Sequence, residues 1–221
     1  MRPGPDIGRA KRNHEMIAIV DFGGGNLRSV ESALQRIGSR AEIASTPEAV
    51  RNADAVILPG VGAAAPAMAG LRERNLDVAI VDALKRGVPF LGICLGLQLL
   101  FERSAEDGAT CLSILRGSVE RLQTTEKLPH VGWNSIDPVG AHPVLAGLDR
   151  EPMYFVHSYV VVPADRDLEL AQTTHGVPFV SAVAAGRVVG VQFHPERSGS
   201  AGLALLKNFV RFARVEAANV A

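Results

Sequence analysis

"VPFLGICLGLQLLFER", residues 88–103, predicts a buried strand at 88–94 that passes directly into a helix at 95–103. The same order of a short apolar run and an amphipathic segment recurs upstream. There we expect strands at 16–22 and 55–60 and helices at 26–38 and 75–87. Strands that alternate with helices predict an α/β fold, with a mostly parallel sheet and helices on both of its faces.

The second half of the chain contains strand-like runs with little helix between them, which predicts antiparallel or mixed strands added to the same sheet. These runs lie at 111–115, 153–163, 168–174, 178–186 and 187–196, and an amphipathic helix is expected at 200–214. We find no repeat and no linker, so we expect one domain over residues 16–221. Residues 1–15 predict a flexible N-terminal extension, and Met16 is a second candidate start.

The composition argues against several classes of protein. With 221 residues, 47% of them hydrophobic and 21% charged, the chain can bury a hydrophobic core that needs no stabilisation by disulfide bonds or bound metals. Its 23 Lys and Arg balance 23 Asp and Glu, which argues against nucleic acid or a membrane surface as the main partner. Two cysteines are too few for a disulfide framework, and neither a membrane span nor a secretory signal is present, so we expect a cytoplasmic protein.

Cys94 lies between Gly92 and Gly96, where the expected strand ends and the expected helix begins. This Gly-x-Cys-x-Gly pattern is typical of a nucleophile elbow, a turn so tight that side chains two positions away would collide. The dipole at a helix N-terminus stabilises a thiolate, and the backbone N–H of Leu95 would face an oxyanion. The motif alone leaves a buried structural cysteine as an equal alternative.

The segment QFHPE, residues 192–196, contains the groups that a cysteine nucleophile needs. Side chains alternate along an extended chain, so His194 and Glu196 point to one side and Pro195 points away. A carboxylate beside an imidazole fixes its tautomer and stabilises its charged form, which makes His194 a candidate base and Glu196 its orienting acid. His142 also precedes a proline but lacks an acid two residues later, so we expect no catalytic role for it.

The remaining signals are weaker. The glycine-rich turn after the first strand lacks the third glycine of a dinucleotide-binding loop. Gly60 and Gly62 follow a strand, and the backbone amides near Val61 and Gly62 could form the second half of an oxyanion hole.

No histidine or cysteine pair has metal-binding spacing, so we expect no metal and no cofactor. Cys111 is expected to be a buried structural thiol, and His157 either faces the site or only packs.

Cys94, His194 and Glu196 lie in two motifs that together resemble those of the class I, triad-type glutamine amidotransferases. The motifs are Gly-x-Cys-x-Gly-x-Gln at 92–98 and a late His-Pro-Glu at 194–196. Within that superfamily the chain is similar to the glutaminase subunits of imidazole glycerol phosphate synthase, which serve histidine biosynthesis. The stretches that carry this similarity are DFGGGNLRSV, LPGVGA, GICLGLQLLFE, PHVGWN, YFVHSY and GVQFHPERS.

The resemblance implies a three-layer amidotransferase fold and a glutaminase reaction. Cys94 would attack the side-chain amide carbon of glutamine, and His194 would carry a proton to the departing ammonia. Water activated by His194 would then hydrolyse the glutamyl thioester, while Glu196 orients His194. The resemblance further implies an oxyanion hole from backbone amides of Val61, Gly62 and Leu95, and substrate binding by Gln98, Ser158 and Tyr159.

The resemblance also implies a separate partner, because a (β/α)₈-barrel synthase takes roughly 250 residues on its own. The two subunits would form a heterodimer, a lyase-type synthase in which ammonia reaches the barrel through a protected passage and imidazole glycerol phosphate and AICAR are made. Asn26, Trp133, Tyr154 and Arg197 are implied to face the partner, although a core position is an equal alternative for Trp133. The family often has a lysine in place of Arg197, and residues 63–70 are unusually rich in alanine.

Three other functions stay open from the sequence. The chain could serve another synthase, such as the one for anthranilate or pyridoxal phosphate. It could be a cysteine peptidase or another thiol hydrolase on a similar fold. It could also be a non-catalytic binding subunit, although the complete Cys, His and Glu set makes this the weakest alternative.

Overall fold

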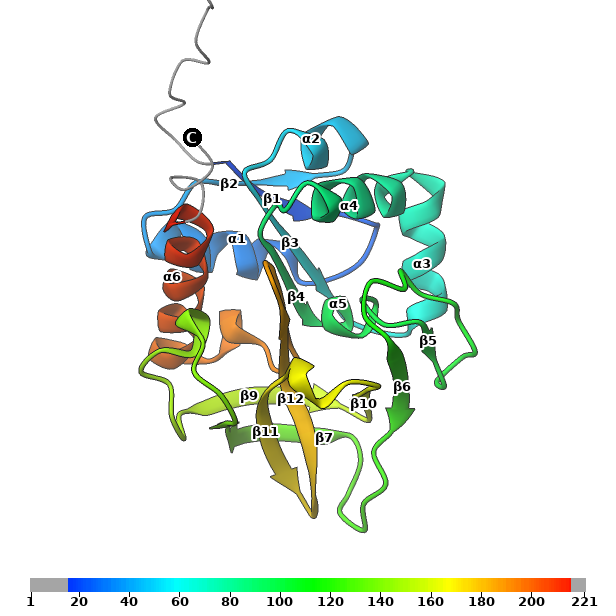
Figure 1. Cartoon of the computed structure of the whole chain (residues 1–221), viewed down its shortest axis with the longest axis vertical. Coiled ribbons are helices and arrows are strands. Elements are labelled where there is room, and N and C mark those ends of the chain that lie inside the picture. Colours follow the sequence, from blue (N-terminus) through cyan, green and yellow to red (C-terminus); the bar gives the residue numbers. More distant parts are fainter. Residues whose placement is uncertain (1–15, 216–221) are drawn as a thin grey trace, which may run out of the picture.

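The computed structural model describes residues 16–215. Within these residues, a mixed sheet of eleven strands forms the centre of the molecule (Figure 1). The predicted extension at 1–15 lies outside the described residues. One half of the sheet is parallel, in the order β2 (Ala41–Ala44), β1 (Ile17–Val20), β3 (Ala55–Gly60), β4 (Phe90–Cys94) and β13 (Val188–Val191).

The other half of the sheet is mainly antiparallel and continues outward from β13. Its order is β12 (Val177–Ala185), β10 (Tyr159–Pro163), β6 (Gly117–Arg121) and β5 (Arg103–Ser104), and the last two run parallel to each other. Two further strands, β11 (Glu169–His175) and β8 (Asp137–Pro138), pair with each other, and β11 also pairs with β12. The predicted α/β class, mostly parallel with mixed strands added in the second half, is confirmed.

Helices cover both faces of the parallel half and make three layers (Figure 1). The α-helices are α1 (Leu27–Arg36), α2 (Pro47–Arg51), α3 (Ala64–Glu73), α4 (Leu76–Lys85), α5 (Leu95–Gln98) and α6 (Gly199–Val215), and the short 3₁₀ helices are η1 (Pro143–Leu145), η2 (Arg166–Leu168) and η3 (Pro195–Arg197). In β1, Ile17 and Ile19 pack in the core that contains α1 and α6, whereas Ala18 and Val20 pack in the core that contains α3 and α4. Burial on both faces explains why these strands are apolar throughout.

A second, two-stranded antiparallel sheet consists of β7 (His130–Ser135) and β9 (Pro152–His157). It corrects the expectation that every later strand joins the main sheet. The run predicted at 153–163 is divided, because β9 ends at His157 and β10 begins at Tyr159 in the main sheet. Ser158 marks the change of sheet, and its carbonyl accepts a hydrogen bond from the backbone N–H of Leu122 at 2.9 Å.

The helix predicted at 95–103 begins at the predicted residue but is a single turn, Leu95–Gln98, and the strand predicted at 111–115 is not formed among the described residues. Beyond the helix, the carbonyls of residues 99–101 accept hydrogen bonds from backbone N–H groups of residues 112–115. The two segments therefore satisfy each other's backbone groups, and neither continues as regular structure.

Several elements were not predicted, among them α3, which begins in the alanine-rich stretch at 63–70. Alanine is the best helix former, and Pro66 is tolerated because it lies in the first turn. The short elements β2, α2, β6 and β7 were also missed. No helix within residues 16–215 combines the length and the apolar character needed to cross a bilayer.

The packing of α5 on β3 gives a first prediction. A Cβ on Gly96 would overlap the carbonyl oxygen of Leu58 in β3, whereas a Cβ on Gly140 would meet open space. We expect Gly96→Ala to lower the free energy of unfolding by about 1–3 kcal/mol, the range for overpacking. Urea titration of Gly96→Ala beside Gly140→Ala measures it, and equal stabilities of the two variants would contradict the packing described.

Candidate active site

Cys94 is the last residue of β4, and α5 begins at the next residue. Its backbone has φ 54° and ψ −106°, a conformation that non-glycine residues rarely adopt. A Cβ on Gly92 would lie 2.6 Å from the carbonyl oxygen of Gly96, and one on Gly96 would overlap the carbonyl of Leu58. The prediction that the flanking glycines are required by a tight elbow is confirmed.

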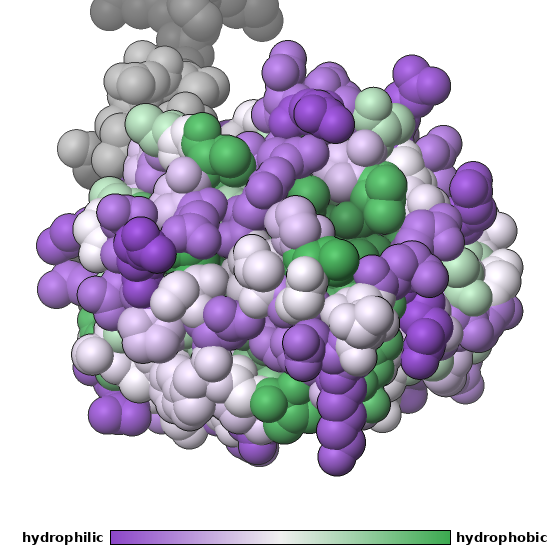
Figure 2. Space-filling view, turned by 90° about the horizontal axis from the view of Figure 1, so that it is seen from below, coloured by the Kyte–Doolittle hydropathy of each residue, from purple (hydrophilic) through white to green (hydrophobic). Residues whose placement is uncertain are grey.

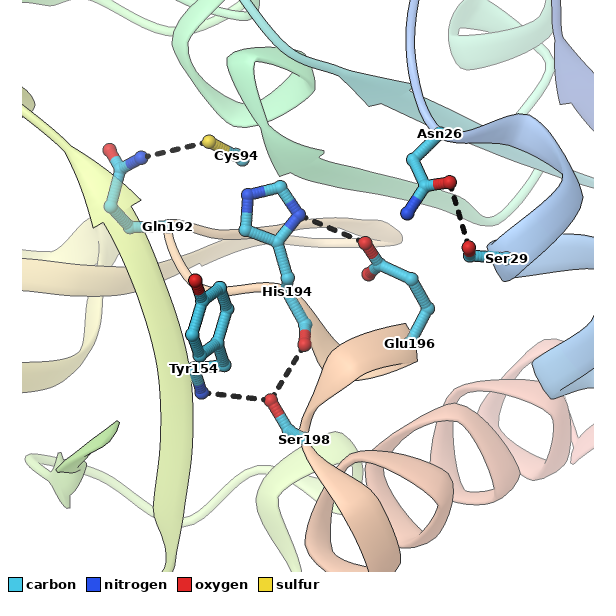
Figure 3. A network of polar contacts seen from close by, with 8 residues as sticks. All are labelled: Asn26, Ser29, Cys94, Tyr154, Gln192, His194, Glu196 and Ser198. Carbon is cyan, nitrogen blue, oxygen red and sulfur yellow. Dashed lines mark hydrogen bonds and ion pairs between the residues drawn. The ribbon is translucent and has the colours of Figure 1, made fainter. Parts of the chain in front are cut away.

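The pairing of β13 with β4 brings the QFHPE segment to the elbow. The two strands are parallel, and Val191 lies beside Ile93. The residue that follows β13 therefore lies beside Cys94. That residue is Gln192, whose Nε2 donates a hydrogen bond to Cys94 Sγ at 3.6 Å, 98 positions away in the sequence. The chain continues past the end of β4 and carries His194 to the same edge of the sheet (Figure 3).

His194 and Glu196 form a buried ion pair beside the cysteine. The ring Nδ1 donates to Glu196 Oε1 at 2.9 Å, and the side chains are 3% and 1% exposed. Figure 3 shows the ring between Glu196 and Cys94, with its second nitrogen turned to the Cys94 side. That nitrogen, Nε2, is buried and makes no hydrogen bond of regular geometry within residues 16–215. It is therefore available to a reacting group.

The pKa of His194 is raised to about 10. Burial alone lowers this pKa, but the Cys94 sulfur and the Glu196 carboxylate, through contact and charge, outweigh the burial. The charged imidazolium is thus the favoured form at neutral pH. A buried cation of this kind next to a sulfur can donate a proton to a leaving amine.

The backbone of His194 is held by β9. Its N–H donates to the carbonyl of Tyr154 at 2.9 Å. The hydroxyl of Ser198 donates to the carbonyl of His194 at 2.6 Å and accepts from the N–H of Tyr154 at 2.9 Å (Figure 3). Ser198 was not predicted, because a serine after His-Pro-Glu-Arg gives no local sign of a contact with β9.

A cavity of about 460 Å³ opens in front of Cys94. This volume is in the range for small-molecule sites. The predicted residues that line it are Val61, Gly62, Leu95, Gln98, Ser158, Tyr159 and Arg197. It is also lined by Glu106 and His157, to which the sequence assigned no definite role.

Gln98 is oriented by the protein itself. Its Nε2 donates to the carbonyl of Tyr159 and to Oε1 of Gln192, both at 3.1 Å. Both amide hydrogens are used in this way, so the side-chain carbonyl is the group that can accept a hydrogen bond from a ligand in the cavity.

Glu106 places a carboxyl group at the wall of the cavity. Burial, and then the charge of Asp107, raise its pKa. Asp107 in turn accepts a hydrogen bond from the N–H of Ala65 in the first turn of α3 at 2.6 Å, which ties the loop to the helix. A bound cation beside Glu106 would be well placed to pair with it.

His157 was expected either to face the site or only to pack in the interior. It does both, because it lines the cavity and is also buried against other side chains. Its Nδ1 donates to the carbonyl of Tyr159 at 3.0 Å, which leaves Nε2 to accept from His130 Nδ1 at 3.1 Å. His130 Nε2 then accepts from the amide of Asn134 at 3.2 Å. Burial lowers the pKa of His157 to about 3 and that of His130 to about 4, so both rings are neutral.

The expected interface residues are partly brought together. Arg197 lies over the ring of Tyr154, with its Cζ 5.4 Å from the ring centroid, and Trp133 meets Tyr154 edge to face at 6.1 Å. Trp133 is 58% exposed, so the alternative of a core tryptophan is wrong. Asn26 precedes α1, where its Oδ1 accepts a hydrogen bond from the hydroxyl of Ser29 at 2.7 Å, and Figure 3 shows it on the Glu196 side of the site.

Two expected structural residues behave as such. His142 precedes η1, and its Nδ1 accepts from the N–H of Val144 at 3.2 Å. Cys111 is buried, and burial, followed by the charge of Asp107, raises its pKa to about 11. A thiol with so high a pKa is a poor nucleophile at neutral pH.

A family model described as glutamine amidotransferase class-I matches residues 18–212. The chain belongs to this family. It is therefore a glutamine amidotransferase, as the motifs predicted.

Close relatives and solved structures agree with this membership. An imidazole glycerol phosphate synthase subunit HisH from Dehalococcoides mccartyi is 48% identical over 200 residues, 90% of this chain and 98% of the relative. The subunit of the same name from Moorella thermoacetica is 46% identical over 200 residues, 90% of this chain and 95% of the relative.

Solved structures share the fold at low identity. A crystal structure described as a glutamine amidotransferase has a TM-score of 0.73 at 21% identity and covers 90% of this chain and 99% of its own. The structure of PurLQS from Thermotoga maritima has a TM-score of 0.74 at 18% identity, with 91% of this chain and 100% of that chain covered. They confirm the three-layer amidotransferase architecture.

The electrostatics of the site give a second prediction. Because the Cys94 sulfur raises the pKa of His194 while burial lowers it, Cys94→Ala should lower this pKa by roughly 1 to 3 pH units. An NMR titration of the histidine ring nitrogens measures the change, and Cys111→Ala is the matched control that should leave it unchanged. A His194 pKa that is the same in both variants would show that the ring does not sense Cys94.

Proposed function

We propose that this chain is the glutaminase subunit of imidazole glycerol phosphate synthase in histidine biosynthesis, and that residues 16–221 act as one domain in the cytoplasm. Relatives carrying the name of that subunit match about nine tenths of the chain at 46–48% identity. The observation that carries the chemistry is the buried His194–Glu196 pair beside the strained Cys94, at a cavity large enough for an amino acid.

In the first half-reaction, Cys94 Sγ bonds to the side-chain amide carbon of glutamine. His194 Nε2 gives its proton to the amide nitrogen, the C–N bond breaks, and ammonia leaves. Glu196 holds the ring by Nδ1, so that Nε2 faces the reacting atoms. The raised pKa of His194 supports this role, because the ring enters the step already protonated.

In the second half-reaction, the now neutral His194 takes a proton from water. The hydroxide bonds to the thioester carbon, the C–S bond breaks, and glutamate is released. The proton stays on His194 and the sulfur leaves as a thiolate, which restores the starting pair.

An oxyanion forms in both half-reactions, and three residues are proposed to bind it through backbone N–H groups. Leu95 is the first residue of α5, where N–H groups have no partner within the helix. Val61 and Gly62 come directly after β3, whose Gly60 pairs with Cys94 across the sheet. All three line the cavity with Cys94.

The rest of the cavity would hold the amino-acid end of the substrate. Glutamine carries an ammonium group, which the Glu106 carboxylate and the side-chain carbonyl of Gln98 can bind. Ser158 and Tyr159 also line the cavity and would complete the subsite. Hydrogen bonds within the protein already hold Gln98 in place, so its side chain loses little conformational freedom when the substrate binds, which favours affinity.

The partner would be a separate (β/α)₈-barrel synthase subunit in a heterodimer that acts as a lyase-type synthase. The exposed Trp133, with Tyr154 and Arg197 beside it, supports docking near the cavity, because Arg197 lines the cavity as well. Asn26 is kept in the proposed interface from the resemblance. Figure 2 shows one face of the molecule, on which apolar side chains form separate areas among polar ones.

One experiment tests the function and separates it from the alternatives. Glutamate release is measured for the purified chain alone and with a co-expressed barrel synthase and its phosphoribosyl ligand. We expect stimulation by the partner of roughly 5- to 150-fold, the range for coupling between two sites. Cys94→Ala should lower the glutaminase activity of the complex by a factor of about 10⁴ or more. Cys111→Ala should leave this activity unchanged.

Equal glutamate release with and without the synthase would contradict the assignment. Stimulation by an anthranilate or pyridoxal phosphate synthase instead would assign the chain to that enzyme. Hydrolysis of peptides or esters without release of ammonia from glutamine would assign it to the thiol hydrolases.

A further inference from the structure

Gln192 has no place in the reaction described above, yet it touches the nucleophile. Its side chain is fully buried, and its Nε2 lies 3.6 Å from Cys94 Sγ, within range of an N–H to sulfur hydrogen bond. The register of β13 against β4 sets this contact, because Gln192 follows Val191, the partner of Ile93. Backbone pairing therefore places Gln192 next to Cys94, and the direction of the contact depends on the orientation of the amide.

A chain of hydrogen bonds determines that orientation. The carbonyl of Tyr159 can only accept, so the nitrogen of the Gln98 amide must face it. The same nitrogen donates to Oε1 of Gln192 at 3.1 Å, which turns the nitrogen of Gln192 toward the sulfur. The amide of Gln192 cannot flip without losing its bond to Gln98. Donation therefore runs outward from the Gln98 nitrogen, on one side to the carbonyl of Tyr159 and on the other through Gln192 to Cys94.

We propose that Gln192 is a positioning residue, which donates an N–H to the Cys94 sulfur and thereby holds it as a thiolate aimed at the cavity. The proposal rests on the proposed role of Cys94 as the nucleophile. A hydrogen bond to a charged acceptor is stronger than one to a neutral acceptor, so the donor favours the ionised sulfur over the thiol and over the thioester. The contact is strongest before attack, weakens when the sulfur is acylated, and returns when glutamate leaves.

The same chain connects the substrate subsite to the nucleophile. Gln98 lines the cavity, and because its amide nitrogen is used within the protein, its side-chain carbonyl is left to accept a hydrogen bond from a ligand there. A cationic group bound to that carbonyl polarises the Gln98 amide, and successive hydrogen bonds strengthen one another in a buried chain. Substrate binding would therefore increase the donation from Gln192 to the sulfur.

The test is the pH dependence of alkylation of Cys94 by iodoacetamide in the full chain. Gln192→Met keeps a side chain of similar length and removes the donor. We expect the midpoint of its pH–rate profile to rise by roughly one to two pH units, the equivalent of one charge-assisted hydrogen bond. Gln192→Glu places a carboxylate against the sulfur and should raise the midpoint further. Rates from Cys94→Ala are subtracted in each case to remove alkylation of Cys111.

The matched control is Gln172→Met, whose amide bonds to Glu169 on β11 and not to the site. It should leave the midpoint unchanged. If Gln192→Met fails to fold, Gln98→Met takes its place, since it removes the group that orients Gln192 and should shift the midpoint in the same direction. A folded Gln192→Met with the wild-type midpoint would overturn the proposal.

This result is separable from the proposed function. A wild-type chain that hydrolyses glutamine while Gln192→Met leaves the midpoint unchanged defeats only the role of Gln192. A wild-type complex that releases no glutamate defeats the assignment of function, whatever the alkylation profile shows.

Discussion

The parallel pairing of β13 with β4 is the constraint on which the site depends. Through it, Val191 lies beside Ile93, so the chain beyond β13 passes the elbow at Cys94 and not some other edge of the sheet. On the other side of β4, the pairing of Gly60 with Cys94 brings the turn after β3 to the same edge. Three parallel strands thus end together, and the cavity lies where ligands bind in open α/β sheets, at the carboxyl ends of the strands.

A single backbone carbonyl, that of Tyr159, sets the polarity of two side-chain networks around this edge. It accepts from Gln98, whose chain reaches Cys94 through Gln192, and from His157, whose chain reaches the second sheet through His130. The first network presents the Gln192 amide to the sulfur. The second joins His157 and His130, whose pKa values are lowered by burial so that both rings are neutral, whereas the pKa of His194 is raised.

The sequence was sufficient for those parts of the fold and site that depend on local pattern. Apolar runs located β1, β3 and β4, and the spacing of glycines about Cys94 and of the acid after His194 singled out three residues, Cys94, His194 and Glu196, that the structure brings together (Figure 3). The contacts of Gln192, Ser198 and Glu106 could not be predicted, because they depend on strand register and on loops that meet only in three dimensions. The helix expected after Cys94 ends early, at Gln98, for the same reason, because residues 112–115 donate hydrogen bonds to the backbone carbonyls of residues 99–101.

A crystal structure of Cys94→Ala with glutamine bound tests the proposed site directly. We expect the substrate in the cavity, with its amide carbon above the Cβ of residue 94 and its amide nitrogen within hydrogen-bond reach of His194 Nε2. Glutamine bound elsewhere, or a ring turned away from that nitrogen, would contradict the claim that β13 delivers the catalytic base to the thiol.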